Sequence, residues 1–159
     1  MRLSLVESVL FLAAAAVAAT ALPRCSGGGS GGLVVRASWA LTPGVLNAAV
    51  TQSTIASTIC RHGWTRTIRP PVSYTNALKV QGLRQYRLRG PPSAFQEDHL
   101  ISLELGGDPV DPRNLWPEPY PRASAVDQIE NDLNHRVCTG SLSLDDAQRR
   151  ESALKHSDG

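Results

Sequence analysis

The chain has 159 residues, of which 42% are hydrophobic and 19% charged, and its net charge is only +2. These values are typical of one globular domain and exclude a strongly acidic or basic protein. The sequence contains no internal repeats, which excludes a repeat architecture. A small single domain is therefore expected.

The first 21 residues predict a signal peptide. Arg2 is followed by an apolar stretch at positions 9 to 21 that ends in small residues, as cleavable export signals do. The stretch is shorter than the roughly 20 residues that cross a bilayer, so a permanent transmembrane helix is a weaker alternative, as is a buried alanine-rich helix. We expect a secreted or extracytoplasmic protein with no stable membrane association after signal removal.

Residues 22 to 32 form a Gly/Ser-rich segment with few side chains able to pack, which predicts a flexible linker. A lipid anchor on Cys25 is an alternative, although the residues before it do not resemble a lipobox. The folded domain is expected to span residues 33 to 154, and residues 155 to 159 are expected to be a disordered tail.

Two of the three cysteines, Cys60 and Cys138, lie inside the expected domain. Export into an oxidising compartment favours a disulfide between them, which would stabilise the domain by roughly 4 kcal/mol in the chain-entropy model. The alternative is three free thiols. No CxxC or Cys-His spacing indicates a zinc site.

Four elements are expected outside the central part of the chain. Residues 51 to 60 predict a short helix, and the weak alternation at 64 to 68 predicts a short strand. A further helix is expected at 76 to 86, with Gly82 weakening its middle. The last helix should follow Ser143, a potential N-cap, and run to about residue 154.

The central stretch, residues 97 to 134, begins with the dipeptide Asp98-His99. Residues 98 to 105 predict a strand that stops at a Gly-Gly turn. Apolar residues then recur at steps of three, four and four, which predicts a helix that ends before a glycine. These apolar positions are Val126, Ile129, Leu133 and Val137, with Gly140 beyond them. Polar side chains, Asp127 and Glu130 among them, lie along the flank of this stripe.

This stretch resembles the HNH, or His-Me finger, endonucleases. The resemblance rests on DHLISLELGG followed by NL, with 15 positions from His99 to Asn114 and 13 more to Asp127, and it covers about a quarter of the chain. It implies an α+β domain with a ββα-metal core and flanking helices. It also implies that His99 is the general base, that Asn114 orients the imidazole, and that Asp98 and Asp127 bind metal.

The residue types agree with this chemistry. An imidazole accepts protons near pH 7, and carboxylates favour a hard ion such as Mg²⁺ or Mn²⁺. Many HNH modules carry another ligand one helical turn before the Asp127 position, where this chain has Ala123. The ion would then be held by two carboxylates and water, or by recruiting Glu130. An ordinary turn is the alternative for the Asp98-His99 pair.

Charge is segregated along the chain. Residues 61 to 89 hold seven basic side chains and no acid, whereas residues 97 to 111 hold five acids and no Lys or Arg. The basic set comprises Arg61, Arg66, Arg69, Lys79, Arg84, Arg87 and Arg89. This pattern favours a nucleic-acid surface beside a metal site; a solvated arginine-rich face is the alternative. The aromatic residues Trp64, Tyr74 and Tyr86 could stack on bases or belong to the core.

Together these features predict an exported, monomeric, metal-dependent endonuclease that acts on DNA or RNA. The alternative is an exported binding module that keeps the scaffold, lacks catalysis, and binds nucleic acid or another anionic polymer. Loss of a ligand at Ala123 favours the alternative.

Overall fold

The computed structural model describes residues 33 to 159. The predicted signal peptide and linker, residues 1 to 21 and 22 to 32, lie outside the described residues. Within that range the domain is α+β, as expected, with four α-helices and a two-stranded antiparallel sheet. The helices are α1 (Trp64–Ile68), α2 (Val72–Gln85), α3 (Arg122–Cys138) and α4 (Leu144–Ser157), and the strands are β1 (Phe95–His99) and β2 (Leu115–Pro119).

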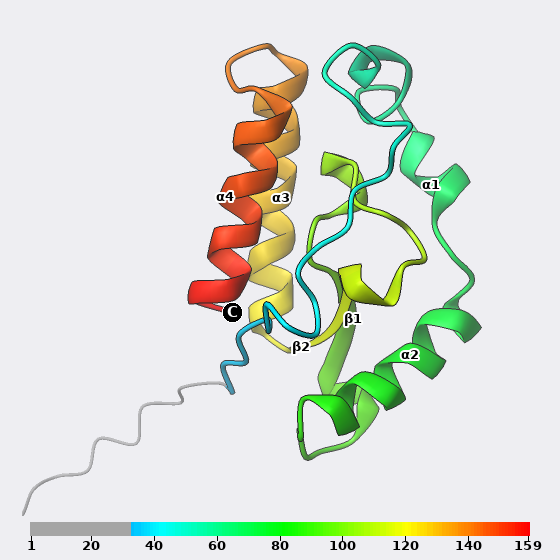
Figure 1. The fold of residues 1–159 in the computed structure, drawn as a ribbon, viewed down its shortest axis with the longest axis vertical. Helices are drawn as coiled ribbons and strands as arrows, with labels where there is room; N and C mark the ends of the chain where they lie inside the picture. Colours follow the sequence, from blue (N-terminus) through cyan, green and yellow to red (C-terminus); the bar gives the residue numbers. More distant parts are fainter. Residues whose placement is uncertain (1–32) are drawn as a thin grey trace, which may run out of the picture.

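The sheet lies between two groups of helices (Figure 1). Helix α2 contacts both strands, α3 contacts both strands from its own side, and α4 packs along α3. The register pairs Asp98 with Trp116 and His99 with Leu115. Because successive side chains of a strand point to opposite faces, Asp98 shares a face with Gln96, and His99 shares the other with Glu97.

Two apolar clusters hold these layers together. One joins the connection between β1 and β2 to α3 and α4, and the other joins the N-terminal described segment to β2. The first contains Val50, Ile59, Ile101, Leu105, Leu133, Val137, Leu142, Leu144 and Ala147, and the second contains Val35, Ala37, Leu100 and Trp116. Trp116 is fully buried, and Tyr86 packs against its cluster. Tyr86 therefore belongs to the core rather than to a base-stacking surface.

Helix α2 approaches β2 through Gly82. A Cβ at this position would lie 2.9 Å from Cδ of Pro117, closer than packed atoms tolerate. Its glycine was expected only to weaken the helix, but it allows the helix and strand to touch. The helix also begins at Val72, earlier than predicted.

Strand β1 ends at His99, so the predicted strand over residues 98 to 105 is wrong in both bounds. Beyond His99 the side chain of Asn114 accepts from Ile101 N and donates to Ile101 O. These bonds take the place of a strand neighbour and let the chain turn. Leu103–Leu105 then forms a 3-10 turn, and Gly106 adopts a φ of 80°, as the predicted Gly-Gly turn requires.

The segment before α2 also differs from expectation. Residues 64 to 68 form α1 instead of a strand, because Trp64 and Ile68, four residues apart, are both half-buried on one side of a helix. The helix predicted at residues 51 to 60 is reduced to a 3-10 turn at Ile55–Ser57. Here the hydroxyl groups of Thr54 and Thr58 bind nearby carbonyl groups, which competes with helical bonding.

Helix α3 agrees with the sequence pattern, with one difference. Its buried residues are Ala123, Val126, Glu130, Leu133 and Val137. Ile129 is 37% exposed, so the carboxylate of Glu130 occupies the place in the buried stripe that the sequence assigned to Ile129.

Helix α4 begins with the predicted cap, in which Ser143 Oγ accepts from Asp146 N. It continues to Ser157, and Lys155 is completely buried. Arg122 donates to the carbonyl of Gly159. The predicted disordered tail at residues 155 to 159 is therefore wrong, because this segment contains the buried Lys155 and its last residue contacts Arg122 of α3.

Cys60 and Cys138 form the predicted disulfide, with a Cα–Cα distance of 5.5 Å across 78 positions. It fixes the segment before α1 to the end of α3. Among residues 33 to 159, no helix combines the length and apolar character needed to cross a membrane.

Candidate functional site

A cleft of about 490 Å³ opens between β1, α3 and the turn at Leu103–Leu105. Its walls are almost entirely polar. The residues that line it are Arg69, Gln96, Glu97, Asp98, His99, Ser102, Leu103, Glu104, Asp127, Gln128, Glu130 and Asn131. The cleft thus contains the candidate base and all three candidate metal ligands.

His99 lies at the end of β1 and is only 6% exposed. Its Nε2 lies 3.2 Å from the carbonyl oxygen of Pro109. A carbonyl oxygen only accepts hydrogen bonds, so Nε2 carries the proton in the neutral ring and Nδ1 is the basic nitrogen. Burial lowers the pKa of His99 below its ordinary value, against the opposing effect of the Pro109 contact. The imidazole is therefore neutral at pH 7 and able to take a proton at Nδ1.

Asn114 lies just before β2 and is completely buried. In addition to its bonds with Ile101, its Nδ2 donates to the carbonyl of Asp108 at 3.0 Å. The next residue, Pro109, supplies the carbonyl that contacts His99. Asn114 therefore acts on the imidazole indirectly, by fixing the loop whose carbonyl contacts the ring.

Asp98, Asp127 and Glu130 converge. One carboxylate oxygen from each lies within 4.8 Å of the others. The amide of Gln96 contacts two of them, at 3.4 Å from Asp98 Oδ1 and 3.2 Å from Asp127 Oδ1. Ala123, where another ligand was considered, is fully buried in the core. Of the two arrangements that the sequence left open, this geometry favours recruitment of Glu130.

The side chain of Lys155, on α4, contacts the same carboxylate cluster from the protein interior. Its Nζ donates to Asp98 Oδ2 at 2.8 Å, to Glu130 Oε1 at 2.6 Å and to the carbonyl of His99 at 2.6 Å. A carboxylate oxygen of Glu151 lies 3.2 Å away. Both oxygens of Glu151 also accept from Ser102 N. The ammonium group thus has a partner for each of its three protons.

The pKa values in this cluster follow from burial and charge. Burial alone would raise the pKa of Asp98, but the charge and hydrogen bond of Lys155 hold it below its ordinary value. The pKa of Lys155 is well above its ordinary value, because its three carboxylate neighbours outweigh burial. Burial raises the pKa of both Glu130 and Glu151. One ammonium therefore does not fully compensate the carboxyl groups around it.

Two more buried carboxyl groups flank the cluster. Neither oxygen of Glu118 has a hydrogen-bond partner among the described residues, and Glu97 Oε2 is similarly unpaired there. Burial, followed by the negative charge of Asp98, raises the pKa of Glu118 to about 8. Burial also raises the pKa of Glu97 to about 8, against the opposing charge of Lys79. At neutral pH both carboxyl groups are therefore mainly protonated and add little negative charge to the cluster.

This donor set fits a hard divalent cation. Asp98, Asp127 and Glu130 offer oxygen ligands of the kind that Mg²⁺ and Mn²⁺ prefer. Beside this set, the buried oxygens of Glu118, which interacts with Asp98, have no hydrogen-bond partner among the described residues. The described acidic residues could therefore hold one metal ion, with Lys155 as a second cation beside it.

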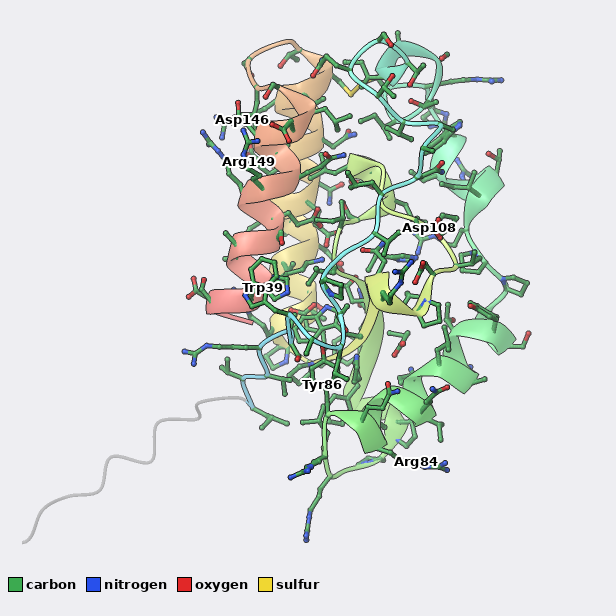
Figure 2. The ribbon with its side chains drawn as sticks, viewed as in Figure 1. Trp39, Arg84, Tyr86, Asp108, Asp146 and Arg149 are labelled. Atoms are coloured by element: carbon green, nitrogen blue, oxygen red, sulfur yellow. A yellow bond between two sulfur atoms is a disulfide. The ribbon has the colours of Figure 1, made fainter. Side chains whose placement is uncertain are left out.

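The seven predicted phosphate-binding residues separate into groups. Arg69 lines the cleft, and Arg61 lines an adjoining hollow of about 400 Å³ that shares Glu104 with it. Lys79 donates to the carbonyl of Phe95. Arg66 is exposed on α1, and Arg87 and Arg89 are exposed beyond the end of α2. Arg84 points outward near the end of α2 (Figure 2).

The sequence interpretation missed Lys155, Glu151, Glu118 and Gln96. Lys155 and Glu151 lie four residues apart on the buried side of α4, with Ala147 and Leu144. Polar residues on the apolar stripe of a helix are a signal that could have identified them. Glu118 lies two residues after the core residue Trp116 on β2, so its side chain is expected on the same buried face of the strand. This position could have identified it.

Comparison with known proteins finds no matching family model, no matching curated protein and no matching solved structure. The functional interpretation therefore rests on the residues of this chain and on their geometry.

Proposed function

We propose that this chain is an exported, metal-dependent endonuclease of the HNH type, with β1, β2 and α3 as its ββα-metal core. The observation that carries the proposal is the placement of a neutral, oriented histidine in one cleft with three convergent carboxylates. Phosphodiester hydrolysis requires a proton acceptor and a cation, and this cleft offers groups suited to both.

His99 is assigned to proton abstraction. Its Nδ1 takes a proton from water, while the Pro109 carbonyl holds Nε2–H and fixes the ring. Asn114 keeps the Pro109 loop in place through the carbonyl of Asp108. Both contacts come from the backbone of one loop, so the base is oriented before substrate arrives.

Asp98, Asp127 and Glu130 are assigned to the divalent ion, with Mg²⁺ or Mn²⁺ as the expected metal. When bound, such an ion stabilises the negative charge that builds on the phosphate and on the leaving oxygen. Arg69 on the cleft wall and Arg61 in the adjoining hollow are suited to bind flanking phosphates of DNA or RNA. Phosphate contacts carry no base preference.

The first test is the variant His99→Ala, compared with His62→Ala. His62 is an exposed histidine in the adjoining hollow, outside the cleft, and serves as the matched control. A plasmid and an RNA would be incubated with each protein in Mg²⁺, Mn²⁺ or EDTA. We expect His99→Ala to lose cleavage by about 10²- to 10⁴-fold, as for removal of a general base, while circular dichroism and polyanion binding are retained.

Wild-type cleavage should require the divalent ion, and His62→Ala should cleave like wild type. Equal activity of His99→Ala and wild type would refute the assignment of the base. In a plot of cleavage rate against pH, the decline on the acid side should occur below pH 6.5, because burial lowers the pKa of His99 and the neutral form persists to lower pH.

The second candidate function is a binding module without catalysis. The observation that favours it is Lys155, whose ammonium already contacts Asp98 and Glu130 and partly fulfils the role of a metal ion. Sensitivity to chelation separates the two functions. Polyanion binding through arginines should survive EDTA, whereas phosphodiester cleavage should not.

A further inference from the structure

The carboxylate cluster has two sides, and only one of them faces the cleft. Asp98, Asp127 and Glu130 line the cleft. Lys155 and Glu151 do not, and the side chain of Lys155 has no exposed surface. The ammonium therefore contacts the cluster from the protein interior, while a soluble ligand would approach from the opposite side.

The hydrogen bonds divide the carboxylate oxygens between these two sides. Lys155 engages Asp98 Oδ2 and Glu130 Oε1. Asp98 Oδ1 instead faces Gln96, whose amide also contacts Asp127. A carboxylate held at one oxygen is fixed in orientation and still has lone pairs on its other oxygen for a ligand, even where, as at Asp98, that oxygen also accepts from Gln96. Lys155 thus orients two of the three candidate ligands without covering the cleft.

We infer that Lys155 holds the carboxylates of the ion site together when no metal is bound and partly substitutes for the charge of the ion. This inference rests on the proposed function only in assigning a divalent cation to the cleft. Without the ammonium, Asp98, Glu130 and Glu151 would be buried together with no positive partner, which is unfavourable in a low-dielectric interior. A divalent ion and Lys155 neutralise the same carboxylates. Removal of Lys155 should therefore increase both the affinity for the ion and the stabilisation that the ion provides.

The experiment compares Lys155→Met with Lys79→Met in the whole chain. Methionine preserves length and apolar contact while removing the charge. Lys79 is the other lysine of the sequence and contacts the Phe95 carbonyl rather than the carboxylate cluster, so it provides a matched control. Thermal midpoints would be measured in EDTA and in MnCl₂, and the Mn²⁺ dissociation constant would be measured by titration calorimetry.

We expect Lys155→Met to have a lower thermal midpoint than wild type in EDTA and to gain more from Mn²⁺ than wild type does. Its Mn²⁺ dissociation constant should fall by on the order of tenfold, because a nearby like charge has been removed. Lys79→Met should match wild type in the Mn²⁺-induced shift and in the dissociation constant. Equal Mn²⁺ responses for the two lysine variants would overturn the inference.

A second variant covers the case in which Lys155→Met is unfolded with and without Mn²⁺. Lys155→Met combined with Glu151→Gln removes one charge of each sign and keeps a side-chain acceptor for Ser102 N. This variant should fold in EDTA and bind Mn²⁺ more tightly than wild type. Wild-type affinity in the double variant would overturn the inference.

The result also separates this inference from the proposed function. If wild type neither binds Mn²⁺ nor cleaves nucleic acid, the nuclease proposal fails. Stabilisation of Lys155→Met by Mn²⁺ would in that case still support Lys155 as the cation that replaces the ion. If wild type binds Mn²⁺ and cleaves, but Lys155→Met responds like Lys79→Met, only the role assigned to Lys155 fails.

Discussion

Helix α4 carries ion pairs on two opposite sides. On its outer side Arg149 lies beside Asp146 (Figure 2) and forms ion pairs with Asp145 and Asp146, and the side chain of Arg149 is 63% exposed. On its inner side Lys155 contacts Asp98, Glu130 and Glu151 with no exposed surface. Both sets consist of one cation and more than one carboxylate, and they differ chiefly in access to water.

Access to water determines how much each set of ion pairs contributes to the stability of the fold. The outer charges remain solvated whether or not they pair, so pairing changes their free energy little. The inner charges have lost their hydration, and each depends on the others for compensation. The inner set joins α4 to β1 and α3 at the cleft, so the terminal helix is part of the candidate site and not an appendage.

The largest effect should come from ending the chain at Leu154. This change removes Lys155 and leaves the carboxyl groups of Asp98, Glu130 and Glu151 buried. Removing one partner of a buried ion pair costs about 3 to 5 kcal/mol, so urea unfolding in EDTA should show a large loss of stability. A chain that ends at Ser157 keeps Lys155 and is the control. Equal urea midpoints for the two truncations would show that the inner ion pairs do not support the fold.

The same contrast explains which site residues the sequence revealed. Asp98, His99, Asn114 and Asp127 were identified because they follow one another along two paired strands and the next helix. The pairing of β1 with β2 and the short connection from β2 to α3 bring these residues together. The spacing of the motif therefore predicted their convergence. The disulfide between Cys60 and Cys138 was predicted correctly for the separate reason of redox environment.

Lys155 could not be found in this way, because 56 positions separate it from His99, whose carbonyl it contacts. Only the packing of α4 against α3 brings it to the cluster. The errors in secondary structure have a similar origin. Residues 98 to 105 alternate like a strand, yet the side chain of Asn114 takes the backbone groups of Ile101. Tertiary contacts of single polar side chains overrode the local pattern.

A smaller effect concerns pH. Burial and the charge of Asp98 raise the pKa of Glu118 to about 8, and burial raises that of Glu97 similarly. Between about pH 4.5 and 8 the folded protein binds protons that the unfolded chain lacks, so the free energy of unfolding should fall as pH rises through this window. The contribution is fully present below pH 4.5 and lost above 8.

Glu118→Gln should flatten this decline and make the protein more stable than wild type at pH 8, by a few kcal/mol at most. Urea unfolding at pH 5, 6.5 and 8 in EDTA would measure the slopes. Asp132→Asn, which changes an exposed carboxylate on α3, should retain the wild-type slope. A decline that is as steep in Glu118→Gln as in wild type would mean that Glu118 is ionised throughout, and that the inner cluster is better compensated than its contacts indicate.

The smallest effect should come from exposed arginines, and it sharpens the contrast between the cleft and the outer side of α4. Arg69→Ala removes an exposed cation from the wall of the cleft, whereas Arg149→Ala removes one from the outer side of α4. Both variants should keep nearly the wild-type thermal midpoint, because exposed charges contribute little to folding. Only Arg69→Ala should weaken binding of a fluorescent oligonucleotide at low salt, with the salt slope reduced by about one. The charge of Arg149 is already neutralised by Asp145 and Asp146, so its loss leaves the polyanion affinity unchanged. If both variants bind with the wild-type slope, Arg69 belongs with Arg149 as a solvated surface charge, and phosphate recognition must be sought among Arg61 and the arginines at the end of α2.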